Sequence, residues 1–223
     1  MNNIWVILMD RNLKVEWTYR TSKPEGFGPF PVIILLHGWT GDENSMLVFT
    51  SRLPENMLKI APRGLYPASQ GGYAWHMRRD GWPRQEDFDP VVEALHEWLS
   101  PAHFPAADFS ELHLVGFSQG AALAYAFTLS HPELVASLSV LSGFLPEGIN
   151  RAPSRRLSGL PVFITHGTKD DLVRVDRARQ AVAFFERAGA QVTYCEHDVG
   201  HKLNASCFKG LEMFFRDISK KIK

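Results

Sequence analysis

Residues Leu112–Ala121 have the sequence LHLVGFSQGA, the most informative pattern in the chain. Its apolar first half predicts a buried strand, and the small residues at its end predict a helix lying close against a sheet. Between them is the pattern Gly-x-Ser-x-Gly, centred on Ser118. A sharp strand-to-helix turn needs glycine on both sides of the serine, because a Cβ there would clash. A chance match is the alternative, but the strand–turn–helix context favours a nucleophilic Ser118.

On both sides of this stretch, short apolar runs alternate with longer segments of helical periodicity, which predicts a mostly parallel sheet with helices on both faces. The buried strands are expected at Val32–Leu36, Leu58–Ala61, Leu112–Phe117, Ser137–Leu141, Pro161–Thr165 and Val192–Cys195, with more exposed strands at Lys14–Tyr19 and Ile4–Met9. The helices are expected at Glu43–Leu53, Asp87–Leu99, Gln119–Leu129, Arg174–Arg187 and Lys202–Ser219. No linker or repeat divides the chain, so we expect one α/β domain over residues 1–223.

The composition is that of an ordinary globular protein, with 45% hydrophobic and 22% charged residues. The 24 basic and 24 acidic side chains cancel, so nothing in the charge suggests nucleic acid or an anionic membrane as partner. The apolar run Ile4–Met9 is too short for a signal core or a membrane span. Two cysteines without metal-ligand spacing, Cys195 and Cys207, indicate a reducing, cytoplasmic location, and whether they pair stays open.

A serine hydroxyl needs a base to become nucleophilic, and in this type of site the acid and the histidine follow the serine in the chain. His201 lies after a glycine in the loop between the last strand and the last helix, a position from which it can reach Ser118. His197 is the rival, and the loop position favours His201. His131 is expected at a helix end, and His166 at a structural turn.

The acid that orients the base is expected in the loop after Pro161–Thr165, where two adjacent carboxylates occur. Asp170 is preferred over Asp171, although the order along the chain leaves both open. Asp176 is expected on the outer face of the next helix.

Two backbone N–H groups must stabilise the oxyanion. One is expected from Gln119, the residue after the nucleophile, and the other from Trp39, in the turn after Val32–Leu36. His37 is expected to brace that turn. Aromatic residues between the strand near Ala61 and the helix near Asp87 are candidates for an acyl-binding wall, Tyr73 and Trp75 in particular, although a purely structural role fits them as well.

Together these segments resemble the phospholipase/carboxylesterase family of small α/β-hydrolases, which includes the acyl-protein thioesterases. The resemblance extends from about Pro31 to Phe215 and rests on LLHG at residues 35–38, APRG at 61–64, GGYAW at 71–75, GFSQG at 116–120, HGxxD at 166–170 and GH at 200–201. It implies a single-domain α/β-hydrolase fold and supports Asp170 and His201 as partners of Ser118. The chain departs from well-known members at Asp171, where many have proline, and at Trp39, often leucine.

The resemblance implies hydrolysis of carboxylic esters or thioesters, without a metal or an organic cofactor. No inserted cap fits between the recognised strands, so we expect an open site for modest acyl groups on a small-molecule ester or thioester. A peptidase, a dienelactone-hydrolase-like enzyme and an inactive binding module on the same fold are the alternatives. We expect no nucleic-acid partner and no stable membrane insertion, and the sequence leaves a homodimer open.

Overall fold

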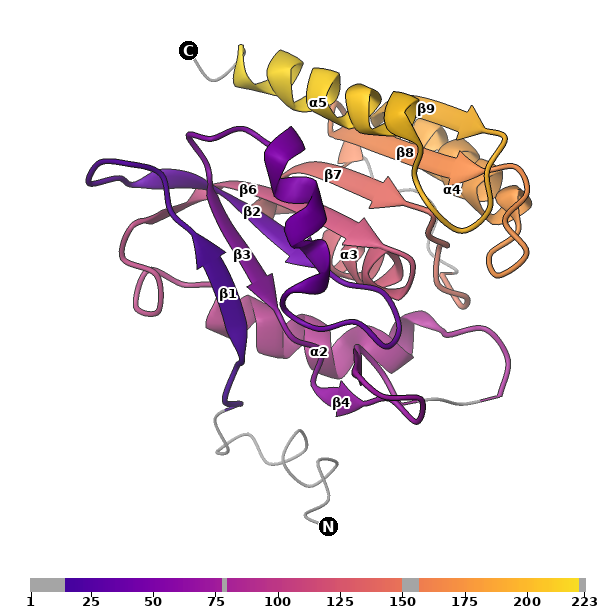
Figure 1. Ribbon diagram of the computed structural model, residues 1–223, viewed down its shortest axis with the longest axis horizontal. Helices are drawn as coiled ribbons and strands as arrows, with labels where there is room; N and C mark the ends of the chain where they lie inside the picture. Colours follow the sequence, from indigo (N-terminus) through magenta and orange to yellow (C-terminus); the bar gives the residue numbers. More distant parts are fainter. Residues whose placement is uncertain (1–14, 78–79, 150–156, 221–223) are drawn as a thin grey trace.

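A seven-stranded sheet forms the centre of the protein, which is described here by a computed structural model over residues 15–77, 80–149 and 157–220. Its strand order is β1-β3-β2-β6-β7-β8-β9 (Figure 1). The bounds are β1 Tyr19–Ser22, β2 Phe30–Leu36, β3 Leu58–Pro62, β6 Ala107–Phe117, β7 Val135–Leu141, β8 Pro161–Gly167 and β9 Gln191–His197. Only β1 runs antiparallel to its neighbour, so the predicted mostly parallel sheet is confirmed.

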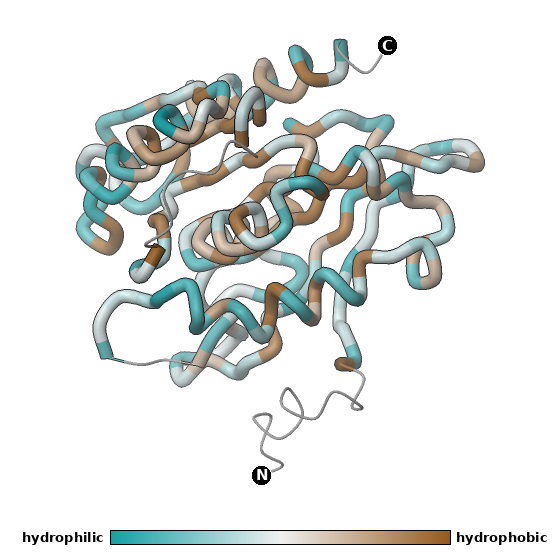
Figure 2. The backbone as a smooth tube through the Cα atoms, turned by 180° about the vertical axis from the view of Figure 1, so that it is seen from behind, coloured by the Kyte–Doolittle hydropathy of each residue, from teal (hydrophilic) through white to brown (hydrophobic). Residues whose placement is uncertain are grey.

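Helices cover both faces of this sheet. The helical elements are η1 Ser45–Arg52, α2 Gln85–Trp98, α3 Gln119–Ser130, η2 Pro132–Leu134, α4 Val175–Arg187 and α5 Ala205–Ser219. Figure 1 shows η1 and α5 in front of the sheet, and Figure 2 shows α3 from behind, crossing the middle of the other face. None of the helices among the described residues is long and apolar enough to cross a membrane.

The apolar run in β2 shows why the central strands were visible in the sequence. Val32, Ile34 and Leu36 belong to the core cluster beneath α2, α3 and α4. The alternate residues Ile33 and Leu35 belong to the second cluster, beneath η1 and α5. Because both faces of a parallel strand are buried, its sequence is apolar throughout rather than alternating.

Two predicted elements differ from the structure. The strand predicted at Lys14–Tyr19, whose first residue lies outside the described residues, is instead β1, Tyr19–Ser22, because the ladder with β3 starts at Tyr19. Trp17, before this ladder, stacks on Trp98 with ring centroids 4.7 Å apart. The helix predicted over 43–53 is the shorter 3₁₀ element η1. The predicted strand over 4–9 lies outside the described residues.

The parallel strands direct their carboxyl ends to one edge of the sheet, where reactive groups of such folds gather. The turn His37–Gly41 follows β2, Ser118 follows β6, and the loops that carry Asp170 and His201 follow β8 and β9. The segment between β3 and α2 approaches the same turn through the short strands β4 (Tyr66–Pro67) and β5 (Tyr73–Ala74), since Gly41 bridges to Tyr73.

Candidate active site

Ser118 occupies a strained turn between β6 and α3. Its φ is 53°, a left-handed conformation that is uncommon for serine, and its N–H donates to the carbonyl oxygen of Leu141 at 2.9 Å. A Cβ on Gly116 would overlap the backbone of Gly120, and a Cβ on Gly120 would overlap the carbonyl oxygen of Leu36. The two glycines of the motif are therefore required by the close approach of helix and strands.

The histidine predicted to act as base lies directly against this serine. His201 Nε2 is 2.9 Å from Ser118 Oγ, and His201 Nδ1 is 2.7 Å from Asp170 Oδ2. The rival His197 instead contacts Cys195, with Nε2 2.7 Å from the sulfur. The structure thus joins Ser118, His201 and Asp170 in one hydrogen-bonded chain.

Asp170 is held as an acceptor by its own loop. Its side chain is buried, and Oδ1 accepts hydrogen bonds from the N–H groups of Leu172 at 3.0 Å and Val173 at 2.8 Å. The other oxygen, Oδ2, is thereby left for His201. Asp171 is exposed, and the carboxylate within hydrogen-bond distance of His201 is that of Asp170.

His166 has a more specific position than the structural turn residue expected from the sequence. It is buried beneath Asp170, with Nε2 3.3 Å from Asp170 Oδ2, and it donates from Nε2 to the carbonyl oxygen of Val173 at 2.7 Å. Burial lowers its pKa. A neutral ring here holds the Asp170 loop in shape without placing a positive charge beside His201.

The two predicted oxyanion donors flank the serine. Gln119 is the first residue of α3, so its N–H has no acceptor within the helix. The N–H of Trp39 donates to no acceptor among the described residues. Gly38, directly before it, allows the turn to lie against the serine, because a Cβ there would be 3.2 Å from Ser118 Cβ.

His37 braces the turn that carries Trp39. The ring is buried; its Nε2 accepts from the N–H of Gly64 at 2.8 Å, and its Nδ1 donates to the carbonyl oxygen of Gly38 at 2.8 Å. Burial lowers the pKa of His37, which keeps the ring neutral and its Nε2 free to accept.

Trp75 completes this brace, and its assignment as a substrate-binding residue needs correction. The side chain is 0% exposed, and its indole Nε1–H donates to the carbonyl oxygen of His37 at 2.6 Å. Its backbone N–H donates to Gln119 Oε1 at 2.8 Å. Trp75 therefore links the two segments that carry the predicted oxyanion donors, and it presents no surface to a substrate.

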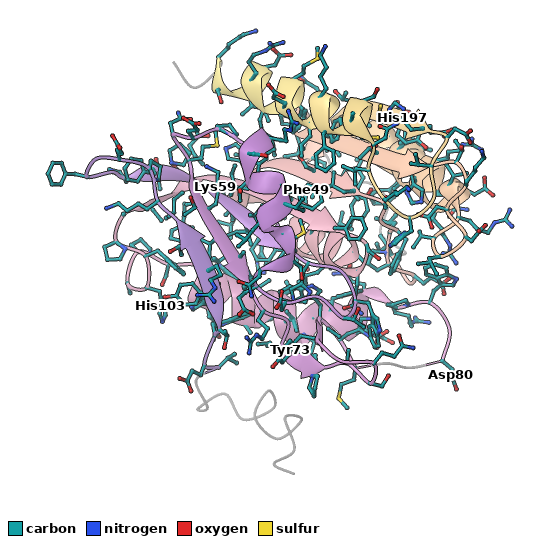
Figure 3. The ribbon with its side chains drawn as sticks, viewed as in Figure 1. Phe49, Lys59, Tyr73, Asp80, His103 and His197 are labelled. Atoms are coloured by element: carbon teal, nitrogen blue, oxygen red, sulfur yellow. The ribbon has the colours of Figure 1, made fainter. Side chains whose placement is uncertain are left out.

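Tyr73, the second predicted substrate contact, is part of a charged cluster behind the same turn. Its N–H donates to the carbonyl oxygen of Gly41 at 2.9 Å, and the Arg63 guanidinium lies 4.5 Å from its ring centroid (Tyr73 is labelled in Figure 3). Arg63 in turn binds the buried Glu43 with both Nε, at 2.6 Å, and Nη2, at 2.9 Å. The buried position of Glu43 was not predicted, because a single acidic residue in a helical segment normally faces solvent.

Two groups of side chains among the described residues could hold a metal ion. In each group the candidate ligand atoms lie within 4.8 Å of one another. One consists of Cys195, His197 and Cys207, and the other of Glu93, His96 and His131. Both cysteines are free thiols in this structure. Neither group includes a member of the Ser118–His201–Asp170 chain.

A mostly parallel sheet, a left-handed serine between strand and helix, and a histidine and an aspartate from the loops after later strands define the α/β-hydrolase fold. The phospholipase/carboxylesterase family model matches residues 28–219, and this chain belongs to that family. The carboxylesterase of Bacillus cereus has a similar structure, with a TM-score of 0.81 at 20% identity over 98% of this chain and 100% of the other.

Two relatives are similar in sequence over part of the chain. A probable inactive carboxylesterase of rice (Oryza sativa subsp. japonica) is 27% identical over 53% of this chain and 50% of its own length. The acyl-protein thioesterase 1 of Kluyveromyces lactis is 35% identical over 44% of this chain and 40% of its own length. The chain thus spans about half the length of the curated relatives it matches, or less.

Proposed function

We propose that this protein is a serine hydrolase that cleaves carboxylic esters or thioesters of modest acyl chains through an acyl-enzyme intermediate. The observation that carries the proposal is a pair of linked hydrogen bonds. His201 Nε2 lies 2.9 Å from Ser118 Oγ, and His201 Nδ1 lies 2.7 Å from Asp170 Oδ2. Membership of a family that is named for carboxylesterases supports it.

The proposed reaction begins with proton transfer from Ser118 to His201. Asp170 accepts from Nδ1–H, which leaves the Nε2 lone pair directed at the serine hydroxyl. The serine oxygen attacks the carbonyl carbon, and the N–H groups of Gln119 and Trp39 stabilise the oxyanion, each contributing about 3 kcal/mol to transition-state stabilisation. His201 then protonates the leaving alcohol or thiol, and water attacks the acyl-enzyme by the same route in reverse.

The expectation of modest acyl groups rests on the segment between β3 and α2. Its described residues, 63–77 and 80–84, contain the short strands β4 and β5 and no helix, so no helical cap covers the serine within them. A small ester or thioester is the proposed partner, and we infer a cytoplasmic location from the two free thiols.

Labelling with a fluorophosphonate probe tests the nucleophile directly. Wild-type protein should be labelled at one serine, and Ser118→Ala should abolish the label, because the probe reacts only with a hydroxyl activated by a base. Ser69→Ala removes an exposed serine and should label like the wild type. Equal labelling of wild type and Ser118→Ala would reject the proposal.

Substrate class is tested with p-nitrophenyl acetate, butyrate, octanoate and palmitate, and with the corresponding acyl thioesters. We expect kcat/KM to be highest for the short and medium chains. A maximum at palmitate would contradict the uncapped site. Labelled protein without activity on any ester or thioester would favour a peptidase on the same fold.

A further inference from the structure

We propose that Cys195, His197 and Cys207 form a zinc-binding site that ties β9 to α5 beside the active-site loop. Their ligand atoms, two thiol sulfurs and one imidazole nitrogen, lie within 4.8 Å of one another. Cysteine and histidine are the residues that Zn²⁺ prefers in proteins, usually in tetrahedral coordination. The structure thus assembles three of four ligands, and a water molecule would supply the fourth.

The positions of the ligands follow from the two elements that carry them. Cys195 and His197 are two residues apart on β9, so they project from the same side of the strand. Cys207 is buried in the first turn of α5, where its N–H donates to Asn204 Oδ1 at 2.9 Å. Figure 3 shows His197 beside the beginning of α5.

The separations are compatible with zinc after small movements. Zn–S bonds of about 2.3 Å and Zn–N bonds of about 2.0 Å in a tetrahedron place sulfur about 3.8 Å from sulfur and about 3.5 Å from nitrogen. Cys195 Sγ is 2.7 Å from His197 Nε2, and no pair of the three atoms is more than 4.8 Å apart. No pair therefore has to change by more than roughly 1.3 Å, which side-chain rotation can supply.

The site has a structural consequence for the neighbouring loop. The backbone carbonyl of His197 accepts hydrogen bonds from the N–H groups of Thr168 at 2.7 Å and Val199 at 2.8 Å. Thr168 precedes Asp170 in the β8 loop, and Val199 precedes His201 in the β9 loop. A metal ion held by His197 would thus fix the residue to which both of these loops are attached.

The sequence did not predict this site, since the two cysteines are twelve positions apart and lack the short Cys-x-x-Cys spacing of common zinc motifs. A disulfide between Cys195 and Cys207 is the competing use of the same thiols. The neighbouring imidazole favours a metal, because a disulfide makes no use of a third ligand.

The experiment uses untagged, chelator-treated protein kept reduced with a phosphine, titrated with Co²⁺ and then with Zn²⁺. We expect one equivalent of Co²⁺ to bind with a thiolate-to-cobalt charge-transfer band, which one equivalent of Zn²⁺ removes. Cys195→Ser, Cys207→Ser and His197→Ala should each lose the band or bind at least tenfold more weakly. His197→Ala serves as the second variant if a cysteine substitution fails to fold.

His131→Ala is the matched control, because it disrupts the other group of potential ligands, which contains no sulfur. It should keep the charge-transfer band. Zinc at a hundred times its dissociation constant should also raise the melting temperature of the wild type by roughly 5–10 °C. The proposal is overturned if wild-type protein shows no charge-transfer band, if both cysteine variants retain it, or if the thiols are found as a disulfide and the reduced protein binds no Zn²⁺.

Discussion

The neighbouring carboxylates Asp170 and Asp171 differ sharply in their surroundings. Asp170 is buried and accepts from His201, whereas Asp171 is exposed. We expect Asp170→Asn to lower kcat by roughly 10³–10⁴-fold, because an amide in this place favours the wrong tautomer of the histidine. Hydrolysis of p-nitrophenyl butyrate measures the effect. Asp171→Asn is the control and should stay within about twofold of the wild type. Equal losses in the two variants would contradict the assignment of the acid.

Trp75 offers a second residue-level test, of its role as a brace. Trp75→Phe keeps most of the ring volume but leaves the buried carbonyl of His37 without its indole donor. We expect the free energy of unfolding to fall by about 1–3 kcal/mol, the usual cost of an unsatisfied buried polar group. Urea unfolding measures it. Trp82→Phe, at a partly buried tryptophan that packs on Phe144, should cost less. A larger loss for Trp82→Phe would contradict the brace.

The roles of some of these single residues could be predicted from the sequence, and the roles of others could not. Ser118 and its glycines were predictable because a backbone conformation demands them. Aromatic residues such as Trp75 were not, since a tryptophan is equally suited to a buried brace and to a substrate wall. The role of Glu43 depends on its ion pair with Arg63, twenty residues away, which no local pattern reports.

The turn from β6 into α3 is the element on which the site depends, and Gly120 is its tightest point. Gly120→Ala would place a Cβ against the carbonyl oxygens of both Leu36 and His37. Because backbone rather than a flexible side chain must give way, we expect the melting temperature to fall by at least about 5 °C. Gly200→Ala is the control, since its Cβ would meet only Lys169 O at 3.7 Å, an ordinary contact. Similar melting temperatures for wild type and Gly120→Ala would contradict the close packing.

Among the elements, central strands were predicted within a few residues and the periphery was not. Val32–Leu36 and Pro161–Thr165 are buried on both faces and so appear as continuous apolar runs. The edge strand β1 has only exposed residues, and its limits depend on pairing with β3, which is distant in sequence. Cys207 lies beside Cys195 only in the folded protein. The sequence prediction that these cysteines bind no metal considered only their spacing along the chain.

Across the whole molecule, histidines buried in neutral form connect the architecture to its response to acid. Burial lowers the pKa of His37, His113, His131 and His166, and that of His113 to about 4. His113 lies on β6 in the middle of the sheet, fully buried, with Nδ1 2.8 Å from Ser137 Oγ. An unfolded histidine has a pKa of about 6.5. Between these pH values the unfolded chain therefore binds protons that the folded protein excludes.

The free energy of unfolding should consequently fall as the pH is lowered from 7 to 4. For His113 alone, the free energy of unfolding should be about 3 kcal/mol lower near pH 4 than at pH 7. Above about pH 7 this loss is absent, because the histidine is neutral in both the folded and the unfolded state. Urea unfolding at intervals between pH 4 and 7 measures the slope. His113→Gln, neutral throughout, should show a slope shallower by up to one proton, whatever its stability at pH 7. His103→Gln, at the surface, should leave the slope unchanged. A His113→Gln slope identical to the wild type would mean that the buried histidine is protonated in the folded protein.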